Sequence, residues 1–351
     1  MTEIEMRRVG AEQLAPFMTA LLASHGVRSE IGAPVVEGLL HASLRGVDSH
    51  GVRLLPHYLR AVKSGRINIE PDFKFEQRLP AAGRLNADHT FGHTAGVEGM
   101  RKAIELAREV GVGAVSVCDS THYGAAAYFA LMAPEEDMIG YSFTNTDALV
   151  VPTGSKERFI GNSPLCFAAP CAGEEPFCLD MATSVVTWNK VLQLRETNTP
   201  LQPQWCVDAE GIETTDPHRA TGLWPLGGYK GYGLSVMVET LCSILGGMPF
   251  GPHIVPMFAG PIEAKRHLGH FFMAMRIDAF QEAEVFKNSL KQLVDELRAM
   301  PPTELDEPVM VAGDPEKKMA AERSEHGIPL PVTLLDEYKN LATQCDVAYD
   351  L

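Results

Sequence analysis

The first 64 residues show the apolar periodicity of amphipathic helices. Apolar residues recur three and four positions apart, which places them on one face of an α-helix. The three stripes are Leu14, Phe17, Met18, Leu21 and Leu22; Val35, Val36, Leu39, Leu40 and Leu44; and Leu54, Leu55, Tyr58, Leu59 and Val62. Gly65 follows the third stripe at a position typical of a helix C-terminus. The pattern therefore predicts an N-terminal segment of three helices.

From Phe73 onward, short apolar runs alternate with helical ones. The runs typical of strands are FKFEQ, RLNA, GAVSVC (113–118), MIGYSFTN, LCFAAP, PFCLD and HFFMAMRI. The helical runs extend from about His93 to Val110, from Ala182 to Arg195, through the apolar segment after GGYKGYG, and from Phe286 to Met300. Between them lies a polar, proline-rich segment, 197–226, for which no element is predicted. This alternation predicts an α/β core.

The pattern also suggests how the chain is divided. Two shorter helical patterns, around 314–325 and 333–343, follow the prolines at 301 and 302 that end the preceding helix. We expect residues 1–70 to form a helical segment packed with the tail, 301–351. Residues 71–300 are then expected to form the α/β core.

Composition limits the possible partners and compartment. The formal net charge is −15, which argues against a nucleic-acid or anionic-membrane partner. An anionic substrate would therefore need a local basic pocket. Seven cysteines without a CxxC pair indicate buried free thiols in a reducing compartment. The first ten residues lack the apolar core of a signal peptide, so a cytoplasmic location is expected.

The stretch RGVDSHGVRLLPHY, residues 45–58, joins the second and third predicted helices. It contains Arg53, His50 and Tyr58 beside two glycines, and glycine next to ionisable residues often marks a sharp turn or a close approach to a ligand. By itself the stretch could equally be a polar turn whose side chains cap the neighbouring helices.

Common cofactor and metal signatures are absent. GVGAVS (111–116) lacks the last glycine of a dinucleotide fingerprint, and it follows a helix rather than a strand. GGYKGYG lacks the spacer of a P-loop. His89/His93 and His267/His270 have ligand-like spacing, but the sequence offers no nearby carboxylate or thiol partner. No metal site is therefore predicted.

Three features stand out as candidate site residues. His122 lies between a predicted strand and a predicted helix, where open α/β sheets bind ligands, and imidazole suits general acid–base catalysis. By itself it could also be a loop histidine that caps the helix. Lys230 lies in a glycine-rich loop before an apolar helix that is expected to be buried, which favours anion binding. DMATS (180–184) could bind hydroxyl groups or simply cap a helix.

Five motifs in this order and spacing carry a resemblance. They are RGVDSHG, STHYGAA, GNSPLCFAAP, DMATS and GYKGYGLS. Together they resemble the malate/L-lactate dehydrogenase family that is unrelated to the Rossmann-type enzymes. That family includes ureidoglycolate, sulfolactate and diketogulonate oxidoreductases and reductases of cyclic imino acids. The resemblance covers about residues 5–340. It implies a non-Rossmann, mixed-sheet α/β fold similar to sulfolactate dehydrogenase, a homodimer, and NAD or NADP as cofactor, with NAD favoured.

The resemblance also implies that residues 71–300 bind the cofactor and the substrate, and it implies an activity and a set of site residues. The reaction is hydride exchange between nicotinamide and the second carbon of a small 2-hydroxy or 2-keto acid, of the malate, lactate or ureidoglycolate type. His122 or His50 would carry the hydroxyl proton. The residues at cofactor-binding positions of the family are Ser49, His122, Thr146, Asp180, Met181, Ala182, Lys230, Ala312, Gly313 and Asp314. The candidate substrate-binding residues are Arg53, Tyr58 and Lys190.

One departure leaves the substrate open. Many relatives carry an arginine four residues after the SHG histidine, where this chain has Leu54 and places Arg53 one position earlier. One residue rotates a side chain by about 100° around a helix, so Arg53 cannot simply replace the missing arginine. Lys190 matches a lysine common in hydroxy-acid enzymes. The alternatives are an NADPH-dependent reductase of cyclic 2-imino acids and a nucleotide-binding protein without turnover.

Overall fold

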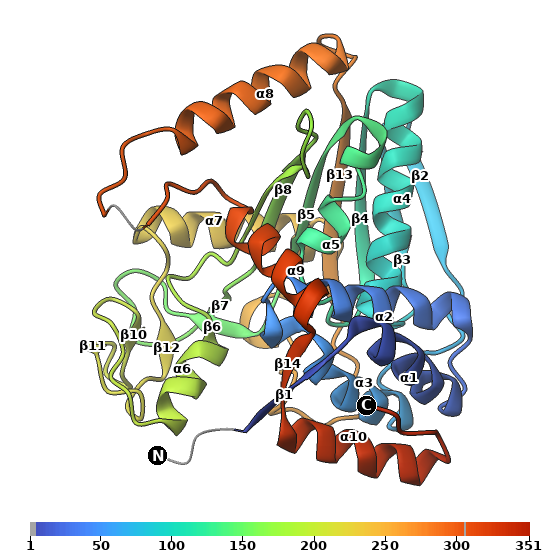
Figure 1. Ribbon diagram of the computed structural model, residues 1–351, viewed down its shortest axis with the longest axis vertical. Helices are drawn as coiled ribbons and strands as arrows, with labels where there is room; N and C mark the ends of the chain where they lie inside the picture. The colour runs from blue at the N-terminus through green and yellow to red at the C-terminus, as the bar shows by residue number, and fades with distance from the viewer. Residues whose placement is uncertain (1–4, 305–306) are drawn as a thin grey trace.

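A computed structural model describes residues 5–304 and 307–351 (Figure 1). Its main element is a mixed seven-stranded sheet in the order β2-β3-β4-β13-β5-β8-β9, in which only β3 and β4 are parallel. The strands are β2 (Lys74–Leu79), β3 (Ala82–Asn86), β4 (Val112–Ser120), β13 (Leu268–Arg276), β5 (Met138–Thr144), β8 (Leu165–Ala169) and β9 (Phe177–Met181). All the predicted strand runs are found here, and the mixed α/β fold is as predicted.

Helices cover both faces of this sheet because its strands alternate apolar side chains to each side. One face packs against α4 (Gly92–Val110) and the short α5 (Ala127–Ala130), around the side chains of Val115, Val117 and Phe272. The other face packs against α8 (Ala283–Arg298) and α7 (Tyr229–Glu239), which continues as a π-helical turn, Thr240–Ile244. Figure 1 shows α4 along the sheet and α8 at the end opposite α10.

The N-terminal helices and the C-terminal helix share a second core. The elements are α1 (Ala11–Ser24), α2 (Ser29–Leu44), α3 (Leu55–Lys63) and α10 (Val332–Cys345), and α9 (Asp314–His326) packs beside α2. Leu21, Leu39 and Leu55 pack with Tyr338 and Leu335 in one apolar cluster. An unpredicted strand, β1 (Met6–Val9), pairs with β14 (Ile328–Pro331) and joins the two ends of the chain. The predicted helices of this segment and of the tail are all present.

A smaller sheet joins three strands of the segment 197–226, for which no element was predicted, to two strands between residues 148 and 161. It has the order β11-β10-β12-β6-β7, with strands β11 (Glu213–Thr214), β10 (Cys206–Val207), β12 (Gly222–Leu223), β6 (Ala148–Val150) and β7 (Ile160–Gly161). Strands of two or three residues are too short to show an alternating pattern, so tertiary pairing alone defines them.

Two helix predictions need correction. The helix expected from Ala182 is α6 (Trp188–Glu196), because the amides of Thr183 and Val185 bond to Asn162 and Trp224 of neighbouring segments. The helix after GGYKGYG was expected to be buried. In the chain α7 instead exposes much of its apolar surface: Leu234, Val236 and Met237 are each about 40% exposed.

Two further observations concern the thiols and the helices. Each of the seven cysteines carries a free thiol, and six of them are buried, as predicted. Across residues 5–304 and 307–351, no helix combines the length and the apolar character needed to span a bilayer.

Candidate active site

The junction between α2 and α3 contains two consecutive 3₁₀ turns, Asp48–His50 and Val52–Leu54. Gly51 is required there, because a Cβ at this position would lie 2.0 Å from Ser43 Oγ. The same hydroxyl accepts a 3.0 Å hydrogen bond from the Val52 amide. Asp48 is paired at 2.6 Å with the buried guanidinium of Arg323 in α9. The junction is therefore held against both α2 and the C-terminal part of the chain.

This junction brings His50 beside His122, 72 positions later in the sequence. The two imidazoles are stacked, with ring centroids 5.4 Å apart and planes 19° from parallel. The Tyr58 hydroxyl in α3 is 2.7 Å from His122 Nδ1, and Ser49 Oγ is 2.8 Å from His50 Nδ1. Because Tyr58 occupies Nδ1 of His122, Nε2 is the nitrogen of that ring left to act on a substrate.

Close packing at the start of α4 positions His122. A Cβ on Gly92 would lie 2.4 Å from the Thr121 carbonyl oxygen and 2.5 Å from the backbone of His122. The Gly92 amide donates to Thr121 Oγ1 at 2.9 Å, and that hydroxyl donates to the Thr90 carbonyl. The helix terminus and the His122 loop thus lie in direct backbone contact.

Burial determines the charge state of both histidines. It lowers the pKa of His50 to about 4. It also lowers the pKa of His122 well below its usual value, and repulsion from His50 and Arg266 adds to this effect. Burial raises the pKa of Tyr58, so its hydroxyl stays protonated. At neutral pH both imidazoles are therefore neutral, and either can accept a proton.

Sequence reasoning missed Arg266. This guanidinium is 3% exposed and forms an ion pair with Asp147, while its Nε donates to the Val255 carbonyl at 2.8 Å. Its positive charge acts to lower the pKa of both Tyr58 and His122. The only signal in the sequence was a pair of basic residues, Lys265 and Arg266, directly before a strand.

A cavity of about 460 Å³ opens beside the two histidines. It is lined by residues from the junction, the His122 loop, β5, β9 and the segment before α9. The predicted site residues among them are Ser49, His50, His122, Thr146, Asp180, Met181, Ala182, Ala312 and Gly313. Side chains that are far apart in sequence therefore share one cavity.

Five other predicted residues do not line this cavity. Tyr58 lies behind His122, and Asp314, the first residue of α9, accepts from the Val311 amide at 3.0 Å while it pairs with Arg298. Arg53, Lys190 and Lys230 are all exposed, so their binding roles stay predictions. Arg53 points outward since its neighbours Val52 and Leu54 are buried in the core.

The cavity has the features that a nicotinamide dinucleotide requires. Gly313 has a φ of +94° and places the backbone before the N-terminus of α9 at the cavity wall, where a helix N-terminus favours a phosphate. Asp180 is open to the cavity, accepts a hydrogen bond of 2.8 Å from the Ala127 amide, and has its pKa raised to about 6 by desolvation among the surrounding protein atoms. Met181, Leu268 and Val311 supply apolar surface for a ring. The residues present fit the cofactor that the sequence indicated.

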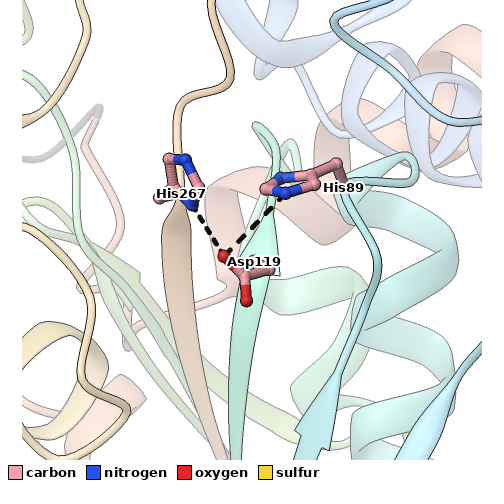
Figure 2. Close-up of side chains that lie close together, drawn as sticks. All are labelled: His89, Asp119 and His267. Carbon is pink, nitrogen blue, oxygen red and sulfur yellow. Dashed lines mark hydrogen bonds and ion pairs between the residues drawn. The ribbon is translucent and has the colours of Figure 1, made fainter.

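The structure also shows the surroundings of the four histidines whose spacing is like that of metal ligands. His93 and His270 are buried and apart from the others, and His270 is bonded to the Thr144 and Ser120 hydroxyls. His89 and His267 do have a carboxylate partner, because Asp119 at the end of β4 lies beside both (Figure 2). The spacing in sequence did not show this, since the three residues come from three separate segments.

Comparison with known proteins decides the family. A sequence profile described as malate/L-lactate dehydrogenase matches residues 9–339. Malate dehydrogenase from Pyrococcus abyssi is 36% identical over 350 residues, which cover 97% of this chain and 95% of that protein. The chain belongs to this family. An NAD⁺-dependent ureidoglycolate dehydrogenase from Escherichia coli K12 is 37% identical over 84% of each chain.

The fold agrees with this assignment. The solved structure of sulfolactate dehydrogenase from Methanocaldococcus jannaschii superposes with a TM-score of 0.92 at 30% identity, covering 98% of this chain and 99% of that one. The predicted family and fold are therefore confirmed. So is the predicted class of enzyme, an NAD(P)-dependent oxidoreductase of small 2-hydroxy acids.

Proposed function

We propose that this dehydrogenase uses His122 to take and return the hydroxyl proton of its substrate. The observation that carries this assignment is the 2.7 Å hydrogen bond between Tyr58 and His122 Nδ1, which fixes the ring beside the cavity with Nε2 free. His50, stacked on His122 and bonded to Ser49, is the second candidate for the same role.

The proposed chemistry divides the work between cofactor and protein. A bound nicotinamide cofactor supplies the hydride acceptor for oxidation and the hydride donor for reduction. During oxidation, His122 Nε2 takes the proton as the C2–H bond breaks and the hydroxyl becomes a carbonyl. Tyr58 accepts from His122 Nδ1–H and so stabilises the imidazolium that forms. The lowered pKa of His122 keeps the ring in its basic form before substrate binds.

Arg266 is our candidate for balancing the substrate carboxylate. It is the buried cation whose charge reaches both His122 and Tyr58, whereas the side chain of Arg53 is exposed. Its guanidinium does not line the cavity and is bonded to Asp147 and the Val255 carbonyl, so it would act on the carboxylate through its charge. We expect Arg266→Gln, which removes that charge, to raise KM for the hydroxy acid at least about tenfold and to change the KM for cofactor little. An unchanged substrate KM would exclude this role.

We propose NAD rather than NADP as the preferred cofactor. Among the described residues that line the cavity, Arg45 is the only lysine or arginine, and it is paired with Glu175 at 2.5 Å. Asp180 and Glu316 also line the cavity, and such acidic groups disfavour an additional phosphate. A lower KM for NADP⁺ than for NAD⁺ would contradict this proposal.

A homodimer is proposed from the exposed apolar surface of α7 and the turn that follows it. Besides the residues of α7, Ile244 and Leu245 are 55% and 59% exposed, and contiguous apolar surface of this kind marks protein interfaces. Light scattering should give twice the chain mass of 38.2 kDa, and Leu245→Asp should shift it toward the monomer. A monomeric wild-type protein would exclude the dimer.

A cytoplasmic location is also proposed, supported by the free thiols.

A substrate panel tests the assignment as a whole. Absorbance at the nicotinamide band would be followed with malate, lactate, ureidoglycolate and sulfolactate, with their keto forms, and with a cyclic imino acid, each with NAD and NADP cofactors. We expect turnover with at least one hydroxy acid. Turnover of the cyclic imine alone would favour an imino-acid reductase. Cofactor binding by calorimetry without turnover of any compound would favour a non-catalytic protein.

A further inference from the structure

Two imidazoles and a carboxylate meet outside the active-site cavity (Figure 2). His89 lies in the turn after β3, Asp119 lies at the end of β4, and His267 directly precedes β13. All three side chains are half-buried, and none of them lines the cavity beside His122. Figure 2 shows both rings directed toward the Asp119 carboxylate.

The distances among these groups are close to those around a metal ion. One potential ligand atom from each residue lies within 4.8 Å of the others. His267 Nδ1 is 2.7 Å and His89 Nε2 is 4.0 Å from the same oxygen, Asp119 Oδ1. Ligands at the bond lengths of a tetrahedral zinc site lie about 3.3 Å apart. Small side-chain rotations therefore suffice to reach coordination geometry. They would lengthen the separation between His267 and Asp119 and shorten the separation between His89 and Asp119.

An ordinary ion pair explains only part of this arrangement. A hydrogen bond between His267 and Asp119 accounts for those two residues. It does not account for His89, whose Nε2 stays beyond hydrogen-bond distance of the carboxylate and whose Nδ1 is buried without a partner among the described residues. A half-buried ring that faces a carboxylate without bonding to it needs a reason, and an ion is one.

The surroundings of Asp119 support coordination. Its other oxygen, Oδ2, accepts a 3.0 Å hydrogen bond from Asn86 Nδ2, which fixes the carboxylate as supporting groups do around metal ligands. All three ligand residues are non-glycine residues with left-handed backbones: φ is +61° at His89, +53° at Asp119 and +51° at His267. Such costly conformations collect at functional sites.

We propose that His89, Asp119 and His267 form a site for one divalent transition-metal ion of the zinc type. Imidazole nitrogen and carboxylate oxygen are ligands of Zn²⁺, whereas Mg²⁺ and Ca²⁺ prefer oxygen alone. His267 is 44% exposed on its side chain, so the fourth coordination position faces solvent.

The ion would act as a clip near the active site. Asp119 is three residues before His122, and His267 lies between Arg266 and the cavity residue Leu268. Metal binding would therefore connect β4, which precedes His122, to β13, which follows Arg266. The ion is expected to affect the stability of the fold and the order of the loop that carries His122. None of the three residues that would bind the ion reaches the reacting atoms.

Calorimetric titration with Zn²⁺ tests the proposal on tag-free, chelator-treated, full-length protein. We expect one ion per chain and a higher melting temperature with Zn²⁺. His89→Asn and His267→Asn should each weaken binding at least about tenfold and abolish the thermal shift. Asparagine tolerates the left-handed backbone, so these variants remove the ligand while keeping the fold.

The matched control is His326→Asn, which removes an exposed histidine 3.9 Å from Glu325 on α9. This variant should bind like the wild type. Cobalt titration supplies a second readout, because Co²⁺ bound by nitrogen and oxygen ligands in low coordination gives a visible absorption band. Lack of one-to-one binding by the wild type would overturn the proposal. The proposal would also be overturned if the His89→Asn and His267→Asn variants bound Zn²⁺ as tightly as the wild type, because the ion would then bind elsewhere on the surface.

Discussion

The Tyr58 hydroxyl lies 2.7 Å from His122 Nδ1, so a residue of α3 orients an imidazole carried by the loop after β4. Tyr58 is 2% exposed, and its hydroxyl therefore cannot exchange this partner for bulk water. Through this bond the N-terminal helices take part in the proposed proton transfer, although Tyr58 itself does not line the cavity.

Tyr58→Phe should lower kcat about tenfold, because about 1.4 kcal/mol of hydrogen bonding to the imidazolium is lost. The pKa seen in the pH profile of kcat/KM should fall as well, since the protonated ring loses its acceptor. Tyr338→Phe is the control: that hydroxyl donates to the Val52 carbonyl at 2.7 Å, so stability should fall while turnover stays unchanged. Equal kcat for Tyr58→Phe and wild type would contradict the positioning role.

His122→Ala and His50→Ala should each keep cofactor affinity and lower turnover by about a hundredfold or more, as expected for lost acid–base catalysis. Fluorescence titration with NADH and steady-state turnover separate the two effects. A variant with normal turnover would identify its histidine as structural and leave the other as the proton carrier. Loss of NADH binding would instead assign the ring to the cofactor.

Gly92→Ala should destabilise the protein by about 1–3 kcal/mol and lower turnover roughly tenfold or more. The new Cβ meets the backbone of Thr121 and His122 at 2.4–2.5 Å, and backbone atoms cannot rotate away. Gly32→Ala in α2 is the control, because its nearest contact is an ordinary 3.5 Å and alanine favours the helix. Urea unfolding and turnover of both variants check this, and a neutral Gly92→Ala would refute the close packing.

Acid should destabilise the fold from about pH 6.5 downward. Burial lowers the pKa of His93 and of His270 to about 3, so between about pH 6.5 and 3 the unfolded chain binds protons that the folded chain does not. Each such histidine lowers the free energy of unfolding by about 1.4 kcal/mol per pH unit as pH falls through this range. Asp180, with its pKa raised to about 6, opposes this effect at a single site.

His93→Leu tests the origin of this acid sensitivity. Both ring nitrogens of His93 are buried without a partner among the described residues, so leucine removes no such hydrogen bond. We expect the free energy of unfolding at pH 7 to stay the same or rise. Its dependence on pH should become shallower by the contribution of about one histidine. Urea unfolding at several pH values measures this, and an identical slope would show that His93 is not a source.

Local sequence patterns predicted most of the elements. The helices of residues 11–63, the strands of the main sheet and the amphipathic α8 each repeat an apolar spacing that their own residues specify. The exceptions were set by pairing between distant segments. β1 exists because β14 lies beside it, and α6 starts six residues late because Thr183 and Val185 bond elsewhere.

The sequence by itself determined the family, the class of chemistry and nine residues that share the cavity, because its motifs record which side chains the reaction needs. Only the tertiary structure decided which charges reach the site. Arg266 is buried near His122 while Arg53 is exposed, and Asp119 meets His89 and His267. The physical reason is that electrostatic interactions and coordination depend on distance in space, and strand pairing sets that distance across more than a hundred residues of chain.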